Sequence, residues 1–158
     1  GNAKEAQEEL DAIAEIKKDP ELKDLVATAN NDSESIASIA YEVVAGELAA
    51  LNSDLSMAAE HLEKAVTLED GLVYTEPAAW HIPTRQNLGA VLLKDKKYKE
   101  AEKVYKEDLD VLRQNGWSLM GLYQSLKAQG KMDEASAIKA EFDVAWEHSD
   151  IEIDTSIL

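Results

Sequence analysis

The feature that most constrains the fold is a pair of apolar stripes in residues 80–112. Apolar side chains recur at spacings of three and four on both sides of the polar turn at 94–97, which places each set on one side of a helix. Small residues, Gly89 and Ala101, stand where the two helices would cross. A small residue there lets the axes approach, and the Tyr105 ring then fills the groove. We therefore predict an antiparallel helix pair.

The same periodicity predicts helices through most of the chain. The further predicted helices cover residues 2–18, 21–28, 34–51, 55–68, 117–128 and 132–146. Asn31 and Glu34 have capping-box spacing, and Gly71 is predicted to stop its helix in the left-handed conformation. Residues 72–83 contain two of the three prolines, and so predict a loop with one helical turn at 76–80.

The composition is that of a helical domain. The chain has 158 residues, 45% hydrophobic and 30% charged, which fits one domain with a continuous core. Proline and glycine, with 3 and 7 residues, are scarce, and the common residues are good helix formers. We predict an all-α fold and a single domain over residues 1–158.

The net charge of −16 argues against nucleic acid and anionic membranes as partners, because both are negatively charged. No apolar run approaches the roughly 20 residues that span a bilayer. The chain contains no cysteine, which excludes disulfides, zinc–thiolate sites and cysteine nucleophiles. The compartment is unknown from these features, with the cytoplasm favoured.

Two helix pairs repeat one spacing: a glycine is followed by a small residue and then by a large residue one turn further on. These residues are Gly46, Ala58 and Leu62 in the first pair, and Gly89, Ala101 and Tyr105 in the second. In a third pair, Gly130 and Ala135 keep the spacing from turn to small residue. Repeated helix pairs with small residues at fixed crossings are typical of a helical solenoid.

At these positions the chain resembles tetratricopeptide repeat (TPR) proteins, and its second half resembles the C-terminal region of an uncharacterised bacterial TPR protein. The resemblance implies a right-handed superhelical solenoid of antiparallel helix pairs, with no chemistry attached. The implied parts are leading helices in 1–30, repeats at about 36–70, 80–113 and 117–148, and a tail at 149–158. Asp108 departs from the family pattern, which usually has a small residue there.

The first group of candidate binding residues lies in the loop and the helix that follows it. It comprises Tyr74, Glu76, Trp80, Arg85 and Asn87. Long loops with aromatic and charged residues often bind ligands, and an arginine can hold a partner carboxylate through two hydrogen bonds. The alternative, which we favour, is that Trp80 packs over a helix end and Arg85 pairs with Glu76.

The second group comprises Trp117, Tyr123 and Gln124, which could face the groove of the solenoid. Aromatic residues at helical spacing are more often core residues, so packing is the alternative. The lysine-rich run at 94–106 could meet an acidic partner or another copy, but such runs are usually solvated.

Catalytic and metal-binding patterns are missing from the sequence. His61, His81 and His148 lie far apart without metal-ligand spacing, and His61 is placed on a solvated helix face. No Ser-His-Asp order or glycine-rich phosphate loop stands out. We therefore predict no catalytic residue, no metal ligand, no cofactor and no enzymatic activity.

The predicted function is a scaffold that binds a protein or peptide along its concave face, with neither nucleic acid nor a membrane as partner. A preformed helical surface loses little entropy on binding. The first alternative is a metal- or small-molecule-binding module of a larger enzyme, centred on residues 70–85. The second is a structural region that caps a larger chain or forms a homodimer through its first helix.

Overall fold

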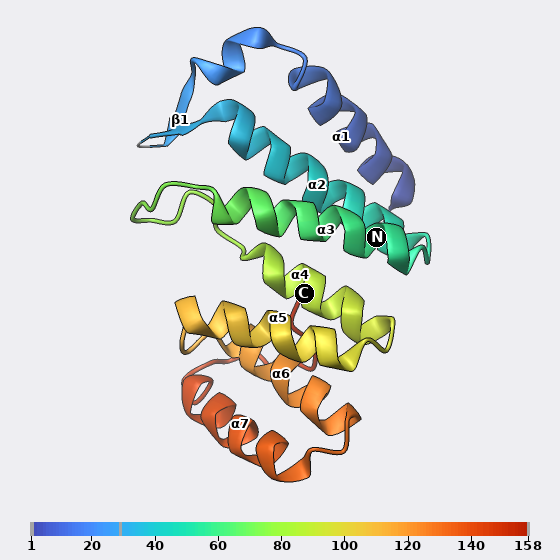
Figure 1. Ribbon diagram of the computed structural model, residues 1–158, viewed down its shortest axis with the longest axis vertical. Helices are drawn as coiled ribbons and strands as arrows, with labels where there is room; N and C mark the ends of the chain where they lie inside the picture. Colours follow the sequence, from blue (N-terminus) through green and yellow to red (C-terminus); the bar gives the residue numbers. More distant parts are fainter. Residues whose placement is uncertain (1, 29, 158) are drawn as a thin grey trace. The chain divides into compact units, whose positions relative to one another are not determined.

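The computed structural model describes residues 2–28 and 30–157 (Figure 1). Within them, seven α-helices and one short strand pair are the main elements, so the all-α prediction is confirmed. The chain divides into two compact units, Gly1–Thr84 (unit 1) and Arg85–Leu158 (unit 2). In the described part of the chain, no helix has both the length and the apolar character needed to cross a membrane.

Unit 1 contains three α-helices, α1 (Ala3–Ile16), α2 (Ser33–Leu51) and α3 (Leu55–Asp70). Helix α2 packs against both of the others. Its contact with α3 depends on a glycine, because a Cβ on Gly46 would lie 2.7 Å from Cγ of Leu62. The Leu62 side chain is wholly buried. The repeated spacing from small to large residue is thus a packing contact in this unit.

The segment between α1 and α2 differs from the prediction. Instead of a helix over 21–28, a short 3-10 helix η1 (Pro20–Lys23) precedes strand β1 (Val26–Thr28). Strand β1 pairs antiparallel with β2 (Asn31–Asp32). The predicted helix is wrong because the β-branched residues that begin and end β1 favour extended backbone.

Two predicted helix ends in unit 1 are also wrong. Helix α2 is capped by Asp32 and not by Asn31, since the Ser35 amide donates to Asp32 Oδ1 at 2.6 Å. This hydrogen bond is the main reason that the pKa of Asp32 is lowered. Gly71 has a φ of −79° and is not left-handed. Its amide instead donates to Leu68 O at 3.2 Å, which closes the last turn of α3 with a right-handed C-cap.

Unit 2 contains α4 (Thr84–Lys94), α5 (Tyr98–Val111), α6 (Gly116–Ala128) and α7 (Met132–Ala145). Helix α6 packs against α5 and α7. The Tyr105 ring, wholly buried, lies against glycines of two helices: a Cβ on either Gly89 of α4 or Gly121 of α6 would overlap it. The sequence predicted that the ring fills one helix crossing, and the structure shows that it packs against two helices, α4 and α6.

The C-terminal tail returns to unit 2 instead of leaving it. Residues 149–157 have no helix or strand, and Figure 1 shows this segment running back from the end of α7 past α6 towards α4. Ile153 packs against a core cluster of Leu119, Met120 and Phe142. The tail is irregular, as predicted, but it is docked on the helices.

Candidate functional site

The loop of the first candidate group belongs to unit 1. The Tyr74 side chain is 81% exposed, and its hydroxyl donates to the Glu76 carboxylate. This hydrogen bond raises the pKa of Tyr74. Trp80 is half-buried, with its ring 5.8 Å from that of His81. Residues 76–80 form bends and not the predicted helical turn.

Both ends of this loop are fastened within unit 1. Asn31 Nδ2 donates to Val73 O at 2.9 Å, and the Val73 amide donates to Asn31 Oδ1 at 2.7 Å. At the other end, the amide and hydroxyl of Thr84 donate to Glu69 Oε2 at 2.8 and 2.6 Å. The loop therefore projects from two fixed points, with Tyr74 as its most exposed aromatic residue.

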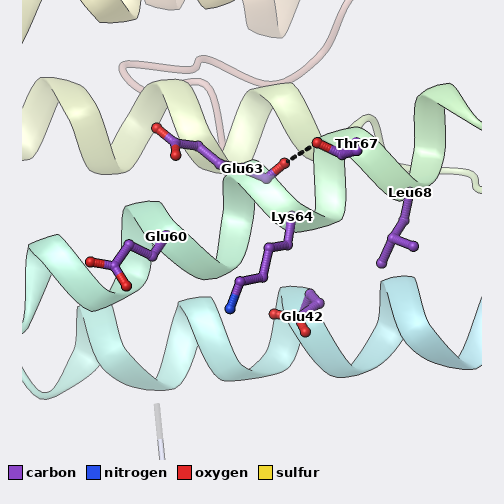
Figure 2. A pocket seen from close by; sticks show the side chains of 6 residues that line it. All are labelled: Glu42, Glu60, Glu63, Lys64, Thr67 and Leu68. Atoms are coloured by element: carbon purple, nitrogen blue, oxygen red, sulfur yellow. Dashed lines mark hydrogen bonds between the residues drawn. The ribbon is translucent and has the colours of Figure 1, made fainter.

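Unit 1 also has an open hollow of about 570 Å³ between α2 and α3 (Figure 2). It is lined by Glu42, Glu60, Glu63, Lys64, Thr67 and Leu68. Beside it, His61 Nδ1 lies 2.6 Å from Glu42 Oε2, with only 21% of the His61 side chain exposed. The prediction of a solvated His61 is wrong, because this side of α3 packs against α2.

The charges of this hollow attract cations in general, since carboxylates outnumber its one ammonium group. Selective metal binding needs several converging ligands. Among the residues that the structure describes, no group of three or more His, Asp or Glu side chains is arranged to hold a metal ion. The hollow therefore has an acidic lining, but its described side chains are not arranged to bind a metal ion.

A buried hydrogen-bonded contact joins the tail to the helices of unit 2 at Ser156, which is wholly buried. Its Oγ lies 2.6 Å from the Tyr105 hydroxyl and donates to Gln86 O at 3.1 Å. A serine has one hydroxyl proton. Because Ser156 gives it to Gln86, Tyr105 must donate to Ser156. Burial raises the pKa of Tyr105 well above its usual value, which keeps this donor protonated.

The rest of the tail is held through its main chain. The Gln124 side-chain amide on α6 donates to Asp154 O, and Trp146 Nε1 donates to Ile151 O at 2.7 Å. Side chains at Gln124 and Trp146 thus bind carbonyl groups of the irregular tail, while Ile153 packs on the core cluster and Ser156 is buried. This is how a rigid surface holds an extended peptide.

The two aromatic residues of the second candidate group pack inside unit 2. The Trp117 ring meets the Trp146 ring edge-on, with centroids 5.6 Å apart. Tyr123 packs against the core cluster of α6 and α7, and Lys127 Nζ lies 5.4 Å from its ring centroid. Their contacts support the alternative of core packing, whereas Gln124 is the member of this group that holds the tail.

Arg85 and Asn87 lie on α4. The Arg85 side chain is 17% exposed, with Nε 3.8 Å from Glu107 Oε2. Burial raises the pKa of Asp108, and the positive charge of Arg85 offsets part of this increase. Asn87 is partly buried. The guanidinium thus faces carboxylates of its own unit, which leaves less of it available to a partner.

A buried polar cluster lies at the end of α5. Asp108 Oδ2 accepts hydrogen bonds from Ser118 Oγ at 2.5 Å and Asn115 Nδ2 at 3.0 Å. Burial raises the pKa of Asp108, and these hydrogen bonds offset part of the increase. Ser118 is wholly buried, so a substrate cannot reach it. The cluster stabilises the junction of α5 and α6, and its hydrogen bonds account for a carboxylate at this buried position.

The sequence prediction missed Gln86 and Ser156. A signal for such a contact was present at Tyr105, because a buried tyrosine, unlike phenylalanine, needs a hydrogen-bond partner for its hydroxyl. Nothing near Tyr105 in the sequence identified that partner.

Comparisons with protein-family models, with curated proteins and with solved structures found no match, so no relative supplies an activity for these residues.

Proposed function

We propose that this chain is a TPR-like binding scaffold whose second unit holds an extended protein segment across α4 and α6. The observation that carries this proposal is the seated tail, with Ser156 between Tyr105 and the Gln86 carbonyl. The chain's own segment makes the contacts that we expect of a peptide ligand: bound carbonyls and enclosed side chains.

The placement of the tail agrees with a solenoid. Helices α4 and α6 are the first helices of the second and third predicted pairs, and the first helices line the concave face of such a solenoid. The tail contacts α4 at Gln86 and α6 at Gln124. A segment bound there would lie along the concave face.

The binding surface is rigid before a ligand arrives. The Tyr105 ring is enclosed by Gly89 and Gly121, and its hydroxyl is therefore fixed in direction. Preorganised groups bind with a smaller entropy loss. Because Ser118 and Asp108, the hydroxyl and carboxylate pair of this unit, are enclosed, we propose binding and not catalysis as its role.

Selection of peptides from a displayed random library tests the proposal. The full chain serves as target, both unchanged and as Ser156→Glu, whose charge cannot occupy a wholly buried site. We expect selected peptides to bind at least about fivefold more weakly to Gln124→Ala, since each lost hydrogen bond to a ligand costs about 1 kcal/mol or more. Ser136→Ala, exposed on α7, is the matched control.

Circular dichroism of each variant shows whether the helices remain intact. Failure to select any peptide with either target would overturn the proposal. So would selected peptides that bind equally well to Gln124→Ala.

A further inference from the structure

We infer that residues 150–157 are an intramolecular occupant of the α4–α6 site, that they compete with its ligand, and that the site selects an extended segment with a serine flanked by aliphatic residues. This inference rests on the proposed function. It names the class of ligand and the regulation of the same site.

The serine is specified by the geometry around Ser156. Its side chain is wholly buried, so a larger side chain has no room. An alanine or glycine would fit, but would leave the buried Tyr105 hydroxyl without its acceptor. A buried donor without a partner is costly, and sites built around a hydroxyl therefore reject analogues that lack it.

The flanking preference follows from the other contacts of the tail. Ile153, three residues before the serine, packs against the cluster that includes Leu119 and Phe142, and Ile157 is partly buried. The acidic residues on either side of Ile153 are exposed to solvent: Asp150 and Glu152 precede it, and Asp154 lies between it and the serine. The site therefore selects an aliphatic residue, a serine and a second aliphatic residue. It tolerates a charged residue between the first aliphatic residue and the serine.

The competition follows from how the tail is connected. Helix α7 ends at Ala145, and the tail follows directly, which keeps it near its own site at a high effective concentration. For short linkers this concentration is of millimolar order. A ligand from another molecule must displace the tail, so its apparent affinity falls by the fraction of sites that are open.

Fluorescence anisotropy with a labelled synthetic peptide of residues 150–157 tests this competition. The targets are the full chain, unchanged and as Ser156→Glu. Because the variant releases the tail, we expect it to bind the peptide at least about tenfold more tightly than the unchanged chain does. Glu152→Gln, a change at an exposed tail position, should bind like the unchanged chain. Ile153→Glu is a second release variant, which keeps the test decisive if Ser156→Glu impairs folding.

The selection of the hydroxyl is tested with a second peptide, in which alanine replaces the serine. We expect it to bind the released chain about tenfold more weakly than the serine peptide. Adding Tyr105→Phe to the released chain should abolish this difference, because the Tyr105 hydroxyl that donates to the serine of the peptide is then missing. Equal binding of the two peptides to the released chain would overturn the serine preference.

Equal affinity of the peptide for the unchanged and released chains would overturn the competition. A concentration-dependent dimer of the unchanged chain in light scattering, dissociated by Ser156→Glu, would also overturn it, because the tail would then occupy another copy. If library-selected peptides bind through Gln124 but the tail peptide does not bind, this inference fails and the proposed function stands. If neither kind of peptide binds, both fail.

Discussion

The Tyr105 hydroxyl lies 2.6 Å from Ser156 Oγ, although 51 residues separate them in the sequence. The ring of the same tyrosine fits against Gly89 and Gly121. One side chain thus fills the space between helices and binds the segment that lies on them. Helix packing in unit 2 and occupation of the proposed binding site are therefore physically linked.

Substitution of either glycine should disturb this arrangement. A Cβ on Gly89 or Gly121 would overlap the enclosed Tyr105 ring. We expect Gly89→Ala and Gly121→Ala each to lower the free energy of unfolding by about 1–3 kcal/mol through overpacking, despite the better helix propensity of alanine. Urea unfolding followed by tryptophan fluorescence measures the change.

Gly71→Ala is the control for these variants. Gly71 is exposed with a φ of −79°, and an added Cβ would lie 3.4 Å from Leu68 O, which is an ordinary contact. It should leave the stability nearly unchanged. If Gly89→Ala were as stable as the unchanged chain, the proposed tight fit of Tyr105 would be wrong.

The fold was predictable where the sequence carries local patterns. Spacings of three and four residues predicted the helices, and the glycine before Ala101 and Tyr105 predicted how two of them pack. In contrast, β1 has only three residues, and its partner strand β2 begins at Asn31. The Asn31 side chain is held by the main chain of Val73, 42 residues later. No local periodicity encodes such a contact.

The candidate site was predictable only in part. Gln124 was expected to face a groove; in the structure its side-chain amide donates to the Asp154 carbonyl of the tail, and its binding of a partner stays a prediction. Trp117 is an aromatic residue at helical spacing whether it packs or binds, so its contact with Trp146 could not be derived. Ser156 lies in a polar stretch without regular structure, where nothing in the sequence distinguishes a docked residue from a solvated one.

Acid should reveal the ion-pair cluster around Glu102. Burial alone would raise the pKa of Glu102, but hydrogen bonds from Lys106, Lys131 and Gln129 outweigh it and lower the pKa to about 2. In the unfolded chain a glutamate has a pKa of about 4.3. The carboxylate therefore contributes stability that is present above about pH 4.3 and is lost as the pH falls towards about 2.

We therefore expect Glu102→Gln to be less stable than the unchanged chain at pH 7, and to lose less of its stability between pH 5 and pH 2. Urea unfolding at a series of pH values checks both expectations. Glu100→Gln, exposed on the same helix, should follow the unchanged chain. Parallel pH profiles for Glu102→Gln and the unchanged chain would contradict this account.

Asp108 should respond to pH in the opposite direction. Burial raises the pKa of Asp108 in the folded chain. The protonated carboxyl group therefore contributes stability below the pKa that Asp108 has in the unfolded chain. This contribution is lost as the pH rises through the pKa of Asp108 in the folded chain. Asn in its place still accepts the hydrogen bond from Ser118. We expect Asp108→Asn to be at least as stable as the unchanged chain at pH 7, with an advantage that shrinks in acid. An advantage that grew in acid would refute the expected sign.

Asn31 should control the loop of unit 1. It is buried and forms two hydrogen bonds with the main chain of Val73. We expect Asn31→Ala to cost about 1–3 kcal/mol, because the buried peptide group loses its partners. Hydrogen exchange of the Val73 amide should become faster. Asn52→Ala, exposed in the turn after α2, is the control, and unchanged exchange at Val73 in Asn31→Ala would show that Asn31 does not hold the loop.

A double-mutant cycle on Tyr105 and Ser156 tests most directly whether the tail is seated in the α4–α6 site. Unfolding free energies are measured for the unchanged chain, Tyr105→Phe, Ser156→Ala and the double variant. Because each single change breaks the same hydrogen bond, we predict a coupling energy of about 1 kcal/mol. Strictly additive effects would mean that the two hydroxyls do not interact in solution, and would contradict the proposal that this unit holds an extended segment there.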